Sequence, residues 1–227
     1  MTTLCARRKV GLITIGQSPR VDMVPEMLPL LGDVEPLERG ALDGLTAAEI
    51  AALHPGPDDY TLVTRLRDGS SAVIAERHIL PRMQAAIDEL EAAGADAVVL
   101  VCTGEFPPFR HTVPLLPAER LIVGGVRAIA ANSRLGVICP LPAQVEMTRA
   151  KWGNLTADLH VAAGSPYGDL SDLREAARRL REAAVEYVVL DCMGFTNAMK
   201  DLVRAEVGVP VLLARSVVAR LAAEVLA

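Results

Sequence analysis

Apolar and polar positions alternate along the chain in blocks that are typical of an α/β protein. Short runs rich in Val, Ile and Leu suit buried parallel strands, and longer segments between them have the 3.6-residue apolar period of helices. The predicted strands are residues 10–15, 97–101, 121–123, 135–138, 187–190 and 209–213. The predicted helices are residues 81–93, 126–131, 171–184, 196–206 and a closing helix up to 227. This alternation favours sheets that are mainly parallel.

Several residues indicate where these helices begin and end. Pro81 suits the first turn of its helix, and Gly94 follows the last position of the same helix. Ser171 and Ser216 are suited to N-caps, so we expect them to cap the helix over 171–184 and the closing helix.

A shift of the chain by 90 residues places part of the second half on the first half. Residues 98–104 (VVLVCTG) then lie on residues 188–194 (VVLDCMG), with five of seven positions identical. The same shift superposes two predicted helices and the predicted strands at 121–123 and 211–213. We therefore predict two pseudo-symmetric lobes. The first lobe comprises residues 1–110 plus 213–227, and the second comprises residues 111–212.

The first lobe carries an insertion of about 35 residues, located at about residues 40–76. Thr46 to Glu49 form a capping-box pattern, which opens a short helix. Two β-rich runs, 60–66 and 71–75, then flank Asp68-Gly69, which has the turn chemistry of a β-hairpin. This helix and hairpin are interpreted as a surface elaboration, with a lid or a homodimer contact as the alternatives.

Composition and charge narrow the class of protein. Of 227 residues 51% are apolar, which is ample for a core and excludes wholesale disorder. A net charge of -5 and only seven aromatic residues (one Trp, three Tyr, three Phe) argue against a nucleic-acid surface. No apolar run approaches the ~18 residues of a spanning helix, and the first apolar stretch does not fit a signal peptide. We predict a soluble cytoplasmic protein that binds neither nucleic acid nor membrane.

Two of the four cysteines occupy equivalent places in the repeat. Cys102 and Cys192 each follow a predicted buried strand and precede a glycine by two residues. Because ligands bind beyond the carboxyl ends of parallel strands, two such lobes would present these thiols to each other across one cleft. We expect Cys5 to be structural, and Cys139 to be buried or to line the cleft without reacting.

Opposed thiols suit a specific chemistry, in which one removes a proton from one face of a carbon and the other returns a proton to the opposite face. A thiol with a reference pKa of about 8.5 can do this if a helix N-terminus lowers its pKa, and helix 196–206 behind Cys192 offers one. The chain has no CxxC pair, and the only nearby histidine is His111, nine residues after Cys102. We therefore expect neither a metal site nor a disulfide.

The loop after the first strand offers polar groups at the same edge of the sheet. Gly16 permits a sharp exit from the strand, and Gln17 and Ser18 offer hydrogen-bond donors. Arg20 could clamp a carboxylate or phosphate bidentately, or could simply pair with Asp22. Both readings of Arg20 stay open at this point.

Three segments together resemble the AroM family: residues 15–22 (IGQSPRVD), 101–106 (VCTGEF) and 190–196 (LDCMGFT). The plan of two lobes and two cysteines is more distantly similar to the aspartate/glutamate/hydantoin racemase superfamily. This resemblance implies two flavodoxin-like lobes, a ligand cleft between them, and cofactor-independent chemistry at the α-carbon of a small carboxylate. The name of the family implies a link to aromatic biosynthesis, by the shikimate pathway.

The resemblance also implies roles for individual residues. Cys102 and Cys192 match the two catalytic cysteines of the racemases, and the first loop matches a substrate-holding loop. Substrate contacts are expected from four loops: the first loop, the two cysteine loops and the loop after the first strand of the second lobe. The expected residues are Gly16, Gln17, Ser18, Arg20, Thr103, Gly104, Pro140, Met193 and Gly194. The second cysteine loop departs from the racemases, because Met193-Gly194 replaces their Cys-Thr-His.

These features lead to three functional hypotheses. The first is a racemase or isomerase that acts on a small carboxylic acid with Cys102 and Cys192 as paired acid/bases. The second is a regulator that binds a small carboxylate without catalysis. The third is an isomerase in which a single cysteine acts as a nucleophile on a double bond.

Overall fold

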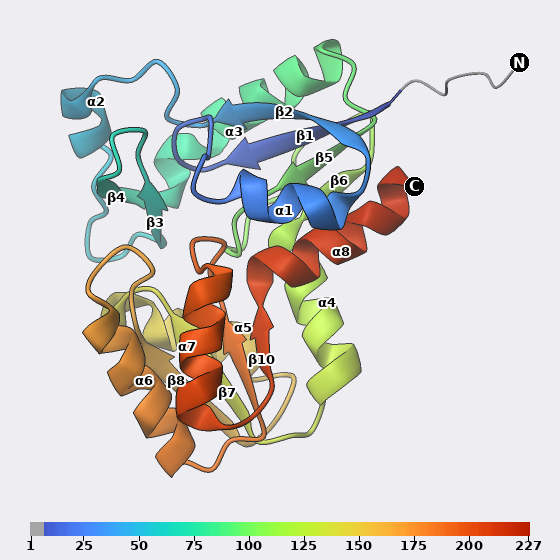
Figure 1. Cartoon of the computed structure of the whole chain (residues 1–227). Helices are drawn as coiled ribbons and strands as arrows, with labels where there is room; N and C mark the ends of the chain where they lie inside the picture. Colours follow the sequence, from blue (N-terminus) through green and yellow to red (C-terminus); the bar gives the residue numbers. More distant parts are fainter. Residues whose placement is uncertain (1–6) are drawn as a thin grey trace, which may run out of the picture.

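The computed structural model describes residues 7–227, and it divides into two lobes that each contain a four-stranded parallel sheet (Figure 1). The first sheet has the order β2-β1-β5-β6 and consists of β1 (Arg8–Thr14), β2 (Val34–Gly40), β5 (Ala97–Leu100) and β6 (Leu115–Pro117). The second has the order β8-β7-β9-β10 and consists of β7 (Leu135–Cys139), β8 (Leu159–Ala163), β9 (Tyr187–Leu190) and β10 (Val211–Leu213). Counted within each lobe, both orders are 2-1-3-4, the start of the flavodoxin-like order. The predicted α/β fold with two similar lobes is confirmed.

Helices cover both faces of each sheet. The helices that pack on the first lobe are α1 (Val24–Leu31), α2 (Ala47–Ala51) and α3 (Glu76–Ala92). The helices of the second half are α4 (Ala118–Ala130), α5 (Val145–Trp152) preceded by the short 3-10 helix η1 (Pro142–Gln144), α6 (Leu170–Glu182), α7 (Asn197–Val207) and α8 (Ala214–Leu226). Figure 1 shows α8 leaving β10 of the second sheet and crossing to α1 of the first lobe, while α4 runs from β6 toward the second lobe.

This exchange of helices builds a core that joins the lobes. Val10 and Leu12 of β1 belong to the same buried cluster as Leu135 and Val137 of β7, together with apolar residues of α4 and α8. Two further clusters lie on the outer faces of the sheets, one under α3 and the insertion and one under α6 and α7. The shared cluster holds the carboxyl ends of the two sheets in a fixed relation.

The predicted strand over 121–123 is wrong, because these residues lie within α4, and the last strand of the first sheet is β6, at 115–117. The helix predicted over 126–131 is the second half of α4, which begins eight residues earlier, at Ala118, and ends at Ala130. The repeat explains the error. β5 and β9 begin at 97 and 187, an offset of 90, whereas β6 and β10 begin at 115 and 211, an offset of 96. The six additional residues accommodate α7, so a single 90-residue shift fails beyond the cysteine loops.

Three helix starts also differ from the prediction. α3 begins at Glu76, directly after the hairpin, so Pro81 lies inside the helix and not in its first turn. The N-cap of α6 is Asp169, whose Oδ1 accepts a hydrogen bond from the Ser171 N–H at 2.9 Å. α8 begins at Ala214, and Ser216 donates its hydroxyl hydrogen to the Leu213 carbonyl at 3.0 Å instead of capping. α6 begins where the Asp169 carboxylate caps it. α3 and α8 begin where the preceding strand, β4 or β10, continues directly into the helix.

The insertion has the predicted structure. Thr46 caps α2 with both hydrogen bonds of a capping box, made with Glu49. β3 (Thr61–Arg65) and β4 (Ser71–Ala75) form an antiparallel hairpin, and Gly69 in its turn has φ +86°, a conformation that favours glycine.

The boundary between the two sheets falls later than the lobe boundary predicted at residues 110 and 111, because β6 pairs with β5 up to Pro117. The return to the first lobe comes with α8, after β10 has closed the second sheet at Leu213. Cys5, predicted to be structural, lies outside the described residues. Across residues 7–227, no helix has both the length and the apolar character needed to span a membrane.

Candidate active site

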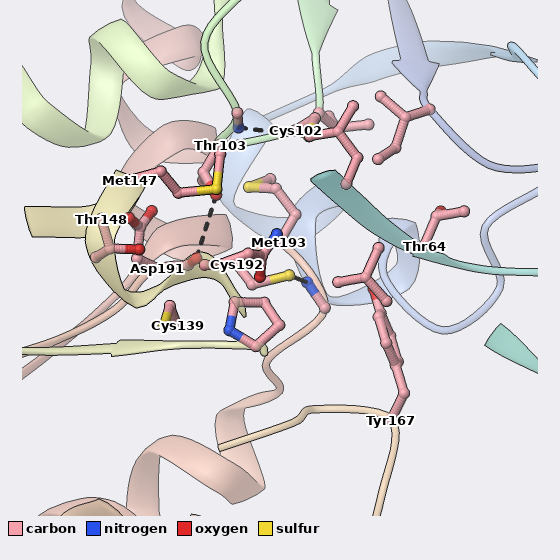
Figure 2. A pocket seen from close by; sticks show the side chains of 18 of the residues that line it. Thr64, Cys102, Thr103, Cys139, Met147, Thr148, Tyr167, Asp191, Cys192 and Met193 are labelled. Atoms are coloured by element: carbon pink, nitrogen blue, oxygen red, sulfur yellow. Dashed lines mark hydrogen bonds between the residues drawn. The ribbon is translucent and has the colours of Figure 1, made fainter. Parts of the chain in front are cut away.

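The carboxyl ends of the central strands of both sheets meet around one cavity of about 60 Å³. Each of β1, β5, β7 and β9 ends at its wall, and Figure 2 shows the side chains that these strand ends contribute. The lining residues from the strand ends are Ile15, Val101, Cys102, Thr103, Gly104, Cys139, Pro140, Asp191, Cys192, Met193 and Gly194. A cavity of this size suits a small ligand, since a single water needs roughly 10–15 Å³ by the same kind of measure.

Cys102 and Cys192 line this cavity from the two lobes, and their local geometry is the same. The Gly104 N–H donates to the Cys102 Sγ at 3.4 Å, and the Gly194 N–H donates to the Cys192 Sγ at 3.3 Å. Burial raises the pKa of the Cys102 thiol to about 12, against the opposing effect of the Gly104 N–H. Burial likewise raises the pKa of Cys192, although the Gly194 N–H and Arg20 act in the other direction. Burial therefore favours the protonated form of both thiols.

A buried ion pair holds the two cysteine loops together. Lys151 of α5 donates to both carboxylate oxygens of Asp191, at 2.8 and 2.9 Å, and to the Thr103 carbonyl at 2.7 Å. Asp191 also accepts from the Trp152 indole N–H at 2.7 Å. The Thr103 hydroxyl donates to the Asp191 carbonyl at 3.3 Å, as Figure 2 shows. Because Asp191 precedes Cys192 and Thr103 follows Cys102, this network fixes the spacing of the two loops.

Arg215 supports the second cysteine loop from behind. Its guanidinium, 1% exposed, donates to the Met193 carbonyl at 2.8 and 3.0 Å and to the Gly194 carbonyl at 3.1 Å. It also forms an ion pair with Glu26 of α1 at 3.0 Å. Arg215 thereby ties the loop of the second lobe to a helix of the first lobe.

Arg20 forms the ion pair with Asp22 that the sequence offered as one alternative, and it also lines the cavity; that it holds a ligand stays a prediction. Its Nε and Nη2 donate to the two carboxylate oxygens of Asp22, each at 2.8 Å, and its Nη1 donates to the Thr14 hydroxyl at 2.9 Å. Arg20 also lines the cavity, next to Tyr167. A guanidinium has five N–H groups; the three bonds above leave two, and the Tyr167 hydroxyl takes up one of these.

The hairpin of the insertion forms one wall of the cavity, through Tyr60, Leu62, Val63 and Thr64. It contacts both lobes. The Tyr60 hydroxyl accepts from the Glu105 N–H at 3.0 Å, and the Gln144 Nε2 donates to the Thr61 carbonyl at 3.0 Å. The Arg65 guanidinium lies 5.7 Å from the centroid of the Tyr167 ring. The interpretation of the insertion as a surface elaboration is therefore wrong, because its hairpin forms a wall of the cavity opposite the strand ends.

The first polar loop, at Gly16, Gln17 and Ser18, was predicted to hold the substrate, but the structure places none of these residues in the cavity lining. The Gln17 Oε1 accepts from the Arg67 N–H at 2.9 Å, and Ser18 donates its hydroxyl to Asp43 at 2.5 Å. A Cβ on Gly16 would lie 2.3 Å from the Thr64 Oγ1. This loop is occupied with anchoring the hairpin, so we assign it to the support of the cavity wall.

The other predicted contact residues all line the cavity, with tasks that differ in detail. Pro140 and Met193 contribute apolar surface, and Thr103 spends its hydroxyl hydrogen on the Asp191 carbonyl. Gly194 must be small, because a Cβ there would lie 2.4 Å from the Tyr167 hydroxyl. At Gly104 a Cβ would lie 2.8 Å from Leu62 of the hairpin. Their contact with a substrate stays a prediction.

Cys139 lines the cavity as a buried thiol whose pKa burial raises to about 11. Among residues 7–227 there is no group of three or more His, Cys, Asp and Glu side chains that could hold a metal ion. His111 is engaged through its Nδ1 with the Val113 carbonyl at 2.9 Å.

Sequence reasoning missed several residues that build the site: Tyr60, Gln144, Lys151, Tyr167, Asp191 and Arg215. Asp191 had a usable signal, because it is the residue at which the two repeated loops differ in charge, with Val101 in the other copy. Lys151, Tyr167 and Gln144 lie on segments that carry no motif. Only the folding of these segments toward the strand ends brings them to the cavity.

Comparison with known proteins supports the fold. The family model described as AroM protein matches residues 10–226. The chain is similar to unliganded arylmalonate decarboxylase, with 16% identity and a TM-score of 0.59, covering 96% of this chain and 92% of that one. For aspartate racemase of Picrophilus torridus the identity is 12%, the TM-score 0.54 and the coverage 92% and 89%. For glutamate racemase from Aquifex pyrophilus the identity is 16% and the TM-score 0.57, and the match covers 93% of this chain and 81% of that one. No curated protein matches the sequence.

Proposed function

The chain belongs to the AroM family, and from this premise we propose that it is a racemase-type isomerase that acts on a small carboxylic acid, with Cys102 and Cys192 as opposed acid and base. One observation carries the proposal. The two thiols enter the same small cavity from the two lobes, and each sulfur accepts an N–H from the glycine two residues later. The similarity in fold to proteins named as racemases and as a decarboxylase supports it.

Two proton transfers, one on each face of the α-carbon, would interconvert the two configurations of the acid. A thiolate on one cysteine takes the α-proton, and the electron pair of the broken C–H bond moves into the carboxylate to give an enediolate. The thiol on the opposite cysteine then donates its proton to the other face of the α-carbon and becomes the thiolate. One turnover therefore inverts the carbon and exchanges the roles of the two cysteines.

The chain's own groups can stabilise the charges that this sequence creates. The Gly104 and Gly194 N–H groups point at the two sulfur atoms, where they favour the thiolate. Arg20, which lines the cavity with an N–H left beyond its bonds to Asp22 and Thr14, offers a donor to the carboxylate and to the developing enediolate. No cofactor is needed for these steps.

Because burial raises the pKa of both thiols, the active form must first lose one proton. We expect kcat/KM to increase with pH above neutrality, with an apparent pKa that belongs to the pair and not to either cysteine.

The test is α-proton exchange in D2O, followed by NMR, over a panel of amino acids, hydroxy acids and shikimate-pathway acids. Exchange of at least one acid that is abolished in a Cys102→Ala/Cys192→Ala double variant supports the proposal. A single Cys→Ser variant should lose racemisation and keep exchange from one face. Absence of exchange for every acid, with one of them clearly stabilising the protein against heat, would contradict it.

The raised pKa values of both thiols also favour a second candidate, a carboxylate-binding regulator in which the thiols stay protonated. In that case the double alanine variant binds the same acid with unchanged affinity. The single-nucleophile isomerase would instead leave a covalent adduct on one cysteine after substrate trapping, detectable by mass spectrometry.

A further inference from the structure

Gln144 presents a buried hydrogen-bond acceptor that nothing in the described chain satisfies. The residue is 9% exposed and lines the cavity. Its Nε2 donates to the Thr61 carbonyl at 3.0 Å, whereas its Oε1 has no hydrogen-bond partner among the described residues. Among residues 7–227 it is the one buried side-chain nitrogen or oxygen atom without a hydrogen-bond partner.

The orientation of this amide follows from its partner. The Thr61 carbonyl can only accept, so the NH2 group of Gln144 must face it. The oxygen is therefore held as an acceptor and cannot be exchanged for a donor by a flip of the amide. A ligand that fills the cavity excludes water, so it must bring its own N–H or O–H to this oxygen or leave it unpaired.

The charges around the cavity are already balanced. Its charged lining residues are Arg20, Lys151 and Asp191. Arg20 is paired with Asp22, and Lys151 is paired with Asp191. Arg20 has N–H left for one carboxylate, whereas Asp191 and the Thr103 carbonyl take all three N–H of Lys151, so a second carboxylate would be buried without a cationic donor.

From these two observations we infer that the ligand is a small acid with one carboxylate and with a hydroxyl or ammonium group that donates to the Gln144 Oε1. This inference rests on the proposed function for the choice of a carboxylic acid. Gln144 is then the residue that determines specificity for the donor group, and dicarboxylic acids are excluded because the lining offers their second carboxylate no cationic donor. A hydroxy acid and an amino acid share the required chemistry, and the experiment distinguishes them.

The experiment measures binding by calorimetry for four acids with three carbon atoms. Lactate carries a hydroxyl, alanine carries an ammonium, propionate lacks a donor, and malonate has a second carboxylate. For the wild-type protein we expect lactate, alanine or both to bind at least about tenfold more tightly than propionate, because the orphaned acceptor costs the donor-free ligand. Malonate should bind more weakly than propionate.

The variant Gln144→Met removes the acceptor and keeps the length of the side chain. We expect the ratio of the propionate Kd to the Kd of the preferred donor-bearing acid to fall to about one. A purely structural role of Gln144 would weaken all four acids alike and leave this ratio unchanged. Met147→Leu, which alters the same cavity without an acceptor, is the matched control and should keep the wild-type ratio.

Each outcome decides the inference. Equal binding of all donor-bearing and donor-free acids by the wild-type protein would overturn it, and this comparison holds even if Gln144→Met does not fold. Persistence of the ratio in Gln144→Met, or binding of malonate above propionate, would also overturn it. The expected pattern without α-proton exchange in D2O would leave the inference standing and remove the proposed function. Exchange without a donor preference would do the reverse. Failure of all four acids to bind would overturn the inference, and the exchange panel would still decide the proposed function.

Discussion

Replacement of Lys151 by Met should test how much the protein depends on the ion pair between its cysteine loops. The Lys151 side chain is 7% exposed and that of Asp191 is 4% exposed, so the pair is shielded from water. The change removes three hydrogen bonds of 2.7 to 2.9 Å and leaves the Asp191 charge with the Trp152 indole as its remaining side-chain donor. Loss of one partner of a buried pair costs about 3–5 kcal/mol in the free energy of unfolding.

For a chain of this size each kcal/mol lowers Tm by about 2–4 °C, so Lys151→Met should lower Tm by about 6–20 °C. Urea and thermal unfolding measure this directly. Arg149→Met is the matched control, because Arg149 lies on the same helix and pairs with Glu146 at 3.5 Å on the exposed surface. Its effect should stay below about 1 kcal/mol.

A double variant separates the effect of the unpaired buried charge on stability from the effect of lost packing. Lys151→Met/Asp191→Asn removes the uncompensated carboxylate, so the double variant should be more stable than Lys151→Met alone. The reasoning is refuted if Lys151→Met is no less stable than Arg149→Met, or if the added Asp191→Asn change destabilises the protein further. Since the network also sets the spacing of the cysteine loops, α-proton exchange should fall in Lys151→Met and stay unaffected in Arg149→Met.

Three further predictions concern the hairpin, the thiols and the second cysteine loop. Gly16→Ala should displace β3, since the new Cβ would lie 2.3 Å from a β3 side-chain oxygen and 2.7 Å from a main-chain carbonyl oxygen. Faster proteolysis of the hairpin would report this displacement. Gly124→Ala, whose Cβ would have no atom within 4 Å, should not show it. Burial raises the pKa of Cys102 from 9.0 to about 12, so its contribution to stability is present below pH 9 and lost between pH 9 and 12. Urea unfolding should thus show a smaller loss over this range in Cys102→Ser, and equal losses would contradict the assignment. Arg215→Met should reduce the free energy of unfolding by about 3–5 kcal/mol, because carbonyls of the second cysteine loop and the Glu26 carboxylate lose a buried partner; a loss under about 1 kcal/mol in urea would show that the loop holds itself.

The fold could be predicted well where local patterns and tertiary structure agree. The run VVL before each cysteine is a buried strand in both lobes, and the capping box at Thr46 forms as the sequence indicates. The prediction failed over residues 115–125. There the apolar run 121–123 suits a strand as well as the apolar face of a helix, and the shift taken from the repeat favoured the strand, whereas the structure has β6 at 115–117 and α4 from Ala118. Ile122, fully buried as the core face of α4, shows how tertiary packing chose between the two.

The candidate site was predictable only in part. The sequence indicated Cys102 and Cys192, because strand ends and the repeat are local features, and the structure brings both to one cavity. Their role as acid and base stays a proposal. Gln17 and Ser18 have the same polar character as true lining residues, but the Gln17 amide oxygen is used by Arg67 in the hairpin turn and the Ser18 hydroxyl by Asp43.

The sequence by itself determined the alternation of strands and helices, the two similar lobes and the two equivalent thiols, since each depends on residues close together in the chain. The tertiary structure decided what surrounds those thiols. Lys151 and Asp191 lie 40 positions apart, and Thr61 and Gln144 lie 83 apart. Such pairs leave no periodic trace, because their partners are chosen by the packing of α5 and the hairpin over the strand ends. That packing also buries the thiols and raises their pKa, a property that no segment of the chain has alone.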